Sequence, residues 1–415
     1  MTRKSFFIAA ICTIVQYYDY HLFGFFAARI SKHFFNHSDP AVQLIRTYMI
    51  MAIGVMAKPI GAIALGRIGD VYGRFATVII SLSGTAAASL IISLSPGYEK
   101  IGIFSALIFL GCRMCIASLV SSGTDGIRIY IFEKINADKQ CLGNGMVVFS
   151  TQVGSFLASI SAWFFSLEFM PSYSWRIAFI IGSFMGLCSI ILRMTCQINN
   201  DNDNKEDPEY HAYKDQNTFK IAAANWRLFI LSSLTAGCIG STYQFIIIFF
   251  GTYNFELLKL VDQQRMQLCT SVGVVLYMIF AVVGGGFADV IGRVRAANIA
   301  SVILIALIGV FAFMISQKSF PLSIYFLIII ILPFITMPAL TLLKQSMPRV
   351  IRYRLFSLAH AFGSIALSAP TAYISTSLYY YSKLEWLPLA YFLFTVVVMT
   401  LCINNLLIIR KNSVD

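Results

Sequence analysis

Long apolar stretches alternate with short polar segments along the whole chain. An apolar helix of about 20 residues is long enough to cross a lipid bilayer, and twelve such stretches occur. The pattern therefore predicts an all-α polytopic membrane protein with twelve transmembrane helices. The expected spans are 6–28, 43–65, 75–95, 102–124, 142–166, 175–196, 228–251, 267–288, 296–316, 320–343, 355–380 and 387–409.

One short polar segment occurs twice. Residues 66–74 read Gly-Arg-Ile-Gly-Asp-Val-Tyr-Gly-Arg, and residues 285–293 read Gly-Gly-Phe-Ala-Asp-Val-Ile-Gly-Arg. The first copy follows the second expected span and the other follows the eighth, so both occupy the same place in their half of the chain. Such a repeat indicates two homologous membrane halves. The functional positions are Gly66, Asp70, Gly73 and Arg74 in the first copy and Asp289, Gly292 and Arg293 in the second.

The longest interruption of the apolar pattern is 197–227, which contains the polar tract 199–208. A tract with so few apolar residues cannot bury a core, so it is interpreted as a flexible connector. The chain is therefore expected to divide into an N-terminal six-helix bundle at 1–196, a linker at 197–227 and a C-terminal six-helix bundle at 228–415.

Composition agrees with a membrane protein, because 58% of the residues are hydrophobic and only 12% are charged. Soluble proteins carry about 25% charged residues. The net charge of +12 comes from loops between spans, and no basic face suited to nucleic acid is visible. By position, 20 of the 31 Lys and Arg residues lie on the N-terminal side of the membrane. The positive-inside rule then places both termini, both copies of the repeat and the linker in the cytoplasm.

The residues of the repeat suit a turn between two helices. Glycines permit a tight turn and a close approach of helices, and Asp70 can accept hydrogen bonds from the free N–H groups that begin the third span. Arg74 can reach neighbouring helix ends or Asp70. The alternative is a tight loop with a cytoplasmic Arg, and the repetition in register argues against it.

No chemistry of an enzyme is evident. Cys112 and Cys115 form a C-x-x-C within an apolar span and have no second pair, so packing is the interpretation and not a metal or redox site. No paired carboxylates or nucleophile motif occur at a membrane edge. We expect no enzyme activity, no cofactor and no metal.

The repeat resembles the loop signature of the major facilitator superfamily, in which it latches the cytoplasmic side during alternating access. Further motifs resemble those of the metabolite:proton symporter group, which includes the proline/betaine transporter. Residues 17–24 resemble W-Y-D-F-x-x-Y-G, 58–61 resemble R-P-L-G, 175–179 resemble W-R-I-P-F, and 347–353 resemble F-P-T-R-V-R-Y.

This resemblance implies two six-helix bundles and proton-coupled import of a small metabolite, either a zwitterionic osmolyte such as proline or betaine, or an organic acid. It implies a bacterial inner-membrane protein whose partners are the substrate, protons and the lipid bilayer. A monomer is expected, and no nucleic acid.

The fourth span departs from the pattern of this group, which reads R-x-x-Q-G-x-x-x-G-G-E. Arg113 keeps the basic position, but the Gln, the glycine pair and the Glu are absent, and Asp125 lies two positions beyond the missing acid. Three alternatives therefore remain beside an importer with another substrate: weakened transport, export, and a membrane sensor or scaffold that no longer transports.

Ionisable side chains within spans are candidates for function, because each costs roughly 2.5–3.5 kcal/mol at mid-helix. Asp19 and Arg113 lie about midway along spans 1 and 4, with Gln16 and Tyr20 on the helical face of Asp19. An Asp19–Arg113 pair would neutralise both charges, and related symporters use such a pair as a proton switch. A static ion pair is the alternative. Lys58 could replace Arg113 as the partner, although snorkelling toward the headgroups is favoured.

Few polar residues occur within the second half, where Tyr243 and Gln244 are the candidates for binding substrate. His360 is interpreted as a packing histidine. Tyrosines near Asp19 could hold a quaternary ammonium through cation–π contacts, and Arg113 could equally hold a carboxylate. Trp175 and Arg176 are expected at the outer interface, and Asp125, Arg128 and Glu133 are interpreted as gate or loop contacts.

Overall fold

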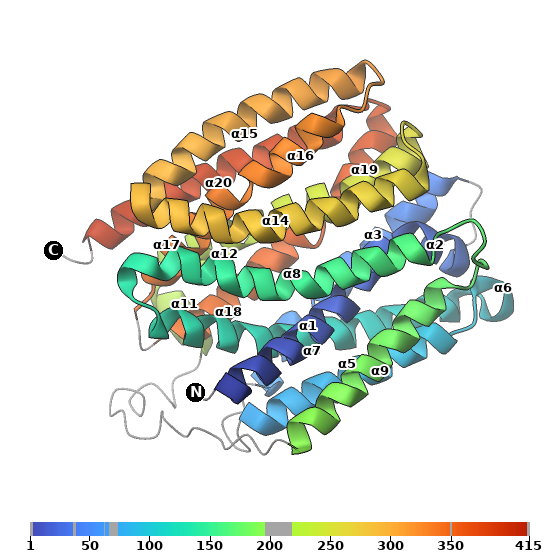
Figure 1. Ribbon diagram of the computed structural model, residues 1–415, viewed down its shortest axis with the longest axis horizontal. Helices are drawn as coiled ribbons and strands as arrows, with labels where there is room; N and C mark the ends of the chain where they lie inside the picture. Colours follow the sequence, from blue (N-terminus) through green and yellow to red (C-terminus); the bar gives the residue numbers. More distant parts are fainter. Residues whose placement is uncertain are drawn as a thin grey trace.

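The helices of the computed structural model lie side by side along one long axis (Figure 1). The structure describes residues 3–35, 39–61, 63–65, 74–195, 218–348 and 351–412. The described residues contain no strand, which confirms the all-α prediction.

The N-terminal half contains six long helices and short segments that connect them. In chain order these are α1 (Arg3–Phe25), α2 (Ala27–Phe34), α3 (Pro40–Val55), α5 (Arg74–Leu94), α6 (Tyr98–Ile101), α7 (Ile103–Lys134), η1 (Ala137–Lys139), α8 (Gln140–Phe164) and α9 (Trp175–Thr195).

The C-terminal half follows the same plan but its helices are interrupted more often. They are α11 (Thr218–Ala224), α12 (Trp226–Tyr243), η2 (Gln244–Phe249), α13 (Phe250–Thr252), η3 (Tyr253–Leu258), α14 (Gln263–Ile291), α15 (Arg293–Ser316), α16 (Leu322–Ile331), α17 (Pro333–Gln345), α18 (Arg352–Gly363), η4 (Ser364–Ser368), α19 (Thr371–Ser382) and α20 (Leu387–Asn412).

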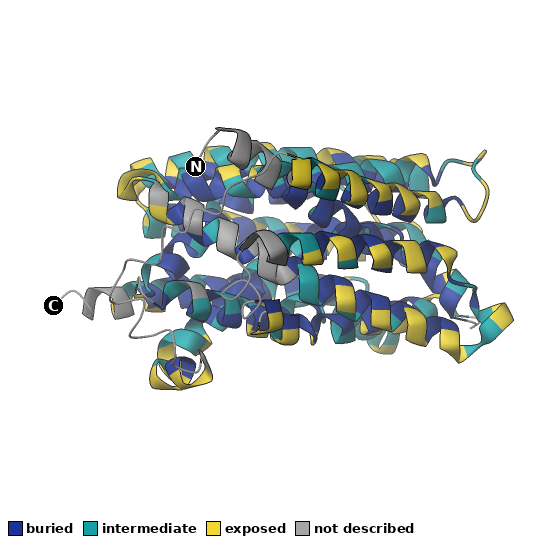
Figure 2. Cartoon of the chain, turned by 90° about the horizontal axis from the view of Figure 1, so that it is seen from below, coloured by how far each residue is buried: buried dark blue, intermediate teal, exposed yellow. Residues whose placement is uncertain are grey.

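Where the structure describes them, the expected spans lie mainly in helix. Within the described part of the chain, ten helices are long and apolar enough to cross a membrane, and α1 and α5 occupy the places of the first and third expected spans. Exposed residues run along the outer helices (Figure 2), and many of them are large and hydrophobic, as lipid contact requires. Examples are Phe104 on α7, Val302 and Phe313 on α15, and Leu401 on α20.

Several boundaries differ from the sequence prediction. Helix α11 begins at Thr218, inside the expected linker 197–227, of which residues 197–217 lie outside the described part. Helix α7 continues to Lys134, so Asp125, Arg128 and Glu133 lie on the helix and not in a loop. Pro333 separates α16 from α17 because it lacks the N–H group that an unbroken helix needs.

Three segments are π-helical: η2, η3 and η4. Such segments hold an extra residue per turn and often lie at functional sites. Their periodicity is too close to that of an α-helix to be recognised in an apolar sequence.

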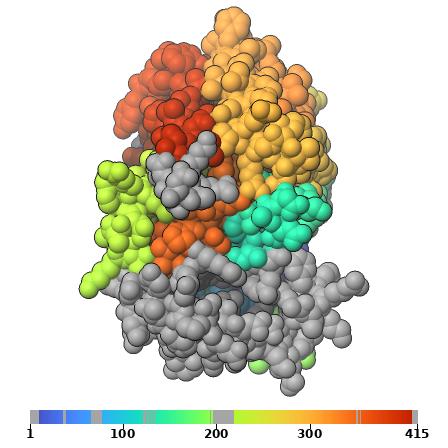
Figure 3. Space-filling model, turned by 90° about the vertical axis from the view of Figure 1, so that its left-hand side faces the viewer, coloured from blue at the N-terminus to red at the C-terminus, as the bar shows by residue number. Residues whose placement is uncertain are grey.

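Helix α1 begins and α20 ends at the same end of the bundle, at the left of Figure 1, and the turn from α14 to α15 lies there too. We call this the motif end and the other the far end. The two halves meet where α8 packs along α14 (Figure 1), and the start of α8 contacts the end of α14 at the motif end (Figure 3). The close approach depends on Gly145 and Gly285. A Cβ on Gly145 would collide with the backbone of Ala281, and one on Gly285 with the backbone of Cys141.

This packing predicts a contrast between adjacent glycines. Gly285→Ala places a methyl group against the Cys141 carbonyl oxygen, whereas Gly286→Ala meets only Leu142 Cδ1, at 3.7 Å. Overpacking costs about 1–3 kcal/mol. Gly285→Ala should therefore lower the thermal unfolding midpoint of the purified protein in detergent, while Gly286→Ala, with the same gain in helix propensity, should leave it unchanged or raise it. Equal midpoints for the two variants would contradict the close α8–α14 contact.

Candidate functional site

The second copy of the repeat forms a latch between the halves at the motif end. Gly292 ends α14 with φ of 102°, a backbone conformation that glycine adopts readily, and α15 begins at the next residue. One turn earlier, Asp289 accepts hydrogen bonds from the backbone N–H groups of Cys141 (3.2 Å) and Leu142 (2.9 Å). These N–H groups lie in the first turn of α8, where a helix has no internal partners for them.

Arg293 completes the latch. Its guanidinium pairs with Asp289 at 3.3 Å and donates to the backbone carbonyl of Ala137, just before α8. The sequence suggested that the aspartate of the repeat caps the helix that follows it. In the second copy it caps a helix of the opposite half instead, because α8 starts beside the end of α14. In the first copy Gly66, Asp70 and Gly73 lie outside the described residues, and Arg74 is described only as the first residue of α5.

Further polar contacts join the halves near the motif end. Glu133 of α7 pairs with Arg352 of α18 at 2.9 Å. Lys344 of α17 is completely buried and donates to Asn144 Oδ1 of α8 at 2.7 Å. Lys344 was not expected from the sequence. It lies one residue beyond the expected tenth span, and a lysine so close to a span was the available signal.

Asp125 is also part of this interface. Its Oδ2 lies 3.1 Å from His360 Nδ1, and its Oδ1 lies 3.5 Å from Arg128 Nη1. Arg128 in turn donates to the Tyr17 hydroxyl. The gate interpretation of Asp125, Arg128 and Glu133 is consistent with these positions, while His360 contacts a carboxylate and does not only pack.

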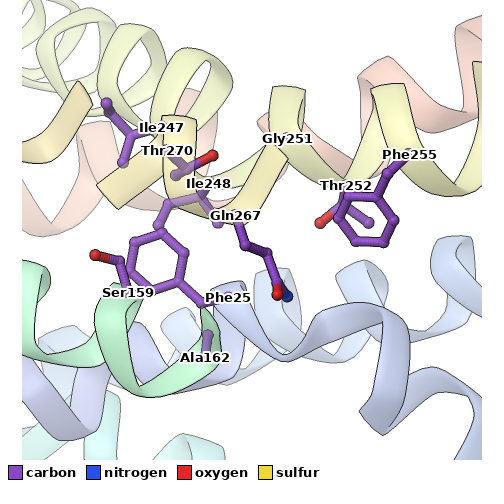
Figure 4. A pocket seen from close by; sticks show the side chains of 10 residues that line it. All are labelled: Phe25, Ser159, Ala162, Ile247, Ile248, Gly251, Thr252, Phe255, Gln267 and Thr270. Carbon is purple, nitrogen blue, oxygen red and sulfur yellow. The ribbon is translucent and has the colours of Figure 1, made fainter. Parts of the chain in front are cut away.

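The two halves also contact each other at the far end. Lys32 of α2 pairs with Glu256 of η3 at 2.8 Å. Toward the far end lies a cavity of about 20 Å³, lined by both halves (Figure 4), which has room for about one water molecule. Its lining includes Phe25, Ser159 and Ala162 from the N-terminal half and Gln267 and Thr270 from the C-terminal half. In this state the interface has contacts at both ends.

Asp19 lies inside the N-terminal half, away from the interface. It is fully buried, its Oδ1 accepts a hydrogen bond from Ser89 at 3.0 Å, and a Cβ on Gly182 would collide with the same oxygen. Among the described residues Oδ2 has no hydrogen-bond partner. The carboxyl group is thus enclosed by α1, α5 and α9.

Arg113 lies on another side of α1. Its guanidinium carbon is 4.6 Å from the ring centroid of Phe23 and 5.4 Å from that of Tyr20, and Nη1 donates to the Tyr20 carbonyl at 3.4 Å. Its Nε has no hydrogen-bond partner in the described structure. The expected Asp19–Arg113 ion pair is not among the ion pairs of the described residues.

The expected face of α1 is divided between two neighbouring helices. Gln16 donates to Ser81 of α5 at 2.9 Å, on the side of Asp19, whereas Tyr20 faces Arg113 of α7. Adjacent residues of a helix point about 100° apart, so Asp19 contacts Ser89 of α5 while Tyr20 contacts Arg113 of α7. Of the residues expected on the helical face of Asp19, Gln16 thus contacts the same helix α5 as Asp19, whereas Tyr20 does not.

Tyr243 and Gln244 do lie between the halves. The Tyr243 hydroxyl donates to Gln152 Oε1 and is 2.7 Å from Ser155 Oγ, both on α8. Gln244 Nε2 is 3.5 Å from Met51 Sδ on α3. Gln152 and Ser155 were missed, because small polar residues within a span carry no charge to mark them.

Lys58 does not snorkel toward the headgroups as expected. It is buried, and Nζ donates to Ser364 of η4 at 3.3 Å, across the interface. The ammonium group lies 5.6 Å from the ring centroid of Tyr20. Trp175 is buried against Phe179, and Arg176 binds the Ser93 and Ser95 carbonyls, so both hold the far end of the N-terminal half together.

Comparison with known proteins decides the family. The family model of the Major Facilitator Superfamily matches residues 9–370, which is most of the chain. The chain belongs to the Major Facilitator Superfamily. Its members among solved structures include a D-xylose-proton symporter that shares the fold, with a TM-score of 0.72 at 14% identity over 95% of this chain and 96% of that one.

Relatives within the superfamily are transporters. A citrate-proton symporter of Klebsiella pneumoniae is 26% identical over 380 residues, covering 89% of this chain and 83% of the relative. A putative proline/betaine transporter of Staphylococcus haemolyticus (strain JCSC1435) is 28% identical over 330 residues, covering 78% and 69%. The resemblance inferred from the sequence motifs is confirmed.

The latch predicts a local change in hydrogen exchange. Asp289→Ala removes the acceptor of the Cys141 and Leu142 amides, so a peptide that covers 140–145 should exchange at least about tenfold faster when measured by mass spectrometry. Asp262→Ala is the matched control, because Asp262 accepts from Gln264 and Arg265 in the first turn of its own helix α14. It should leave 140–145 protected. Unchanged exchange at 140–145 in Asp289→Ala would contradict the latch.

Proposed function

We propose that this protein is a proton-coupled secondary transporter that imports a small polar metabolite by alternating access. In this proposal residues 1–196 and 228–415 move as two six-helix bundles about a site between them. The motif end faces the cytoplasm of a bacterial cell, with both termini there, since the positive-inside rule favours this orientation. The partners are the substrate, protons and the bilayer, and the protein acts as a monomer.

The observation that carries the proposal is the latch at Asp289. It joins α14 of one half to α8 of the other through a carboxylate that accepts hydrogen bonds from two backbone N–H groups. Such a contact can break and form again without unfolding either helix. Together with the Lys32–Glu256 pair at the far end, it provides the two gates that alternating access needs. Relatives named as proton symporters support coupling to protons.

In this proposal Asp19 binds the proton that is transported with the substrate. It is enclosed within one half, with Ser89 as the donor to one oxygen and the other oxygen free of hydrogen bonds among the described residues. A carboxyl group in this setting can hold a proton while the halves move. Gln16, one turn earlier on the same helix, donates a hydrogen bond to Ser81 of α5. Proton binding at Asp19 would reach the interface through α1, whose Tyr20 contacts Arg113.

The substrate is assigned to the interface near Arg113, Tyr20, Tyr243 and Gln244. A zwitterionic osmolyte and an organic acid both offer a carboxylate to Arg113. The relatives include one named as a citrate-proton symporter, which represents the organic-acid class, and ones named as putative proline/betaine transporters, which represent the zwitterion class.

A sensor or scaffold that does not transport is the second candidate, and the altered motif around Arg113 favours it. Export is the remaining variant of the proposal. Uptake into proteoliposomes under an imposed pH gradient, with a panel of osmolytes and carboxylates, separates these possibilities.

The proposed proton-coupling role of Asp19 predicts different results in two transport assays. Asp19→Asn should abolish accumulation driven by a pH gradient, because the amide cannot take up the proton, while counterflow of labelled against unlabelled substrate persists. The amide preserves the size of the side chain and its contact with Ser89. Asp262→Asn, at an exposed helix start, should retain both activities. Gradient-driven accumulation by Asp19→Asn at the wild-type level would contradict the assignment.

A further inference from the structure

Two buried cations contact the same aromatic ring. Lys58 Nζ lies 5.6 Å and Arg113 Cζ lies 5.4 Å from the ring centroid of Tyr20. Lys58 comes from the segment that follows α3, Arg113 from the middle of α7, and Tyr20 from α1. Helices α3 and α7 are held close at this level, since a Cβ on Gly54 would lie 3.1 Å from Arg113 Cβ. The two positive charges are therefore neighbours across a single tyrosine.

Neither cation forms an ion pair with a carboxylate in the part of the chain that the structure describes. Asp125 interacts electrostatically with Lys58, but its oxygens face His360 and Arg128. Asp19 faces Ser89 on the other side of α1. Burying an unpaired charge is costly, so two such cations around one ring favour the binding of negative charge at another stage of the proposed cycle.

The surroundings supply a further unsatisfied polar atom. Arg113 Nε is buried without a hydrogen-bond partner among the described residues, and His21 nearby is only 7% exposed. His21 lies beside Tyr20, with ring centroids 5.4 Å apart, and beside Tyr243 of the opposite half at 5.7 Å. Lys58 also reaches the opposite half, at Ser364. The group of Lys58, Arg113 and His21 therefore borders the interface that opens when the halves separate.

We propose that Lys58 and Arg113 form a two-cation site for a substrate that carries two carboxylates. This inference rests on the proposed transport function and names its substrate class. Each carboxylate takes one cation, with the Arg113 guanidinium able to bind two oxygens at once and Lys58 acting as a point charge. Ser364, released from Lys58 when the halves part, and His21 are placed to bind the remaining oxygens.

The charge balance distinguishes this class from the alternatives. A zwitterion would bring its own positive group to a site that already holds two. A monocarboxylate would leave one of the two cations unpaired. Two carboxylates neutralise both, so the dicarboxylate is the class that removes the cost of burying them.

The experiment is counterflow in proteoliposomes with wild-type protein, Lys58→Gln and Lys58→Arg. The labelled probes are succinate and citrate as carboxylates with two or more acidic groups, acetate as a monocarboxylate, and proline and betaine as zwitterions. We expect the wild type to exchange succinate in preference to the others. Lys58→Gln should reduce that exchange by at least about tenfold, as loss of a charge-assisted hydrogen bond does, while Lys58→Arg should retain it. The thermal unfolding midpoints of both variants establish that they are folded.

The outcomes separate this inference from the function it rests on. Exchange of citrate, acetate, proline or betaine in preference to succinate would overturn the two-cation site and leave the transporter intact. Equal succinate and citrate exchange by Lys58→Gln and wild type would do the same. Exchange of none of the five probes by the wild type, together with no uptake in the broader panel, would overturn both. Loss in Lys58→Gln with retention in Lys58→Arg supports a role for the charge and not for packing alone.

Discussion

The cost of placing charge in an apolar medium is the constraint on which this structure depends. Most of the chain is hydrophobic, so each ionisable side chain within a span is expected to pair with an opposite charge, to be neutralised by a proton, or to take part in function. Asp289 and Arg293 satisfy each other and the free end of α8. Glu133 and Arg352 pair across the halves. These charges close the motif end because the contacts that neutralise them are contacts between halves.

Farther from the motif end, the buried charges do not form ion pairs between the halves among the described residues. There the groups proposed to bind the proton and the substrate lie in different places. Asp19 lies among α1, α5 and α9, whereas Lys58 and Arg113 border the interface with the other half. Proton and substrate would thus bind on different sides of α1. Coupling between them would pass through a single rigid helix, since Asp19 and Tyr20 are adjacent residues whose side chains face different neighbours.

The architecture could be predicted from the sequence because it depends on long-range regularities. Apolar length located the helices, and the repeat at residues 66–74 and 285–293 indicated two equivalent halves. The pairing of Asp19 with Arg113 could not be predicted, because similar depth in two helices does not fix the direction of either side chain. The same reason applies to Lys58, whose direction depends on the packing of α3 against η4. The partner of Asp289 was missed because it is a backbone group of the other half.

The position of Asp289 also gives α8 an electrostatic role in the cycle. The aligned peptide dipoles of a helix leave partial positive charge at its first turn, and a carboxylate there stabilises the helix by about 0.3–1 kcal/mol, or up to about 2 kcal/mol when partly buried. This carboxylate belongs to the opposite half, so α8 keeps that stabilisation only while the motif end is shut. In the proposed transport cycle, this contact would favour the state that is closed at the motif end when no substrate is bound, independently of which substrate is carried.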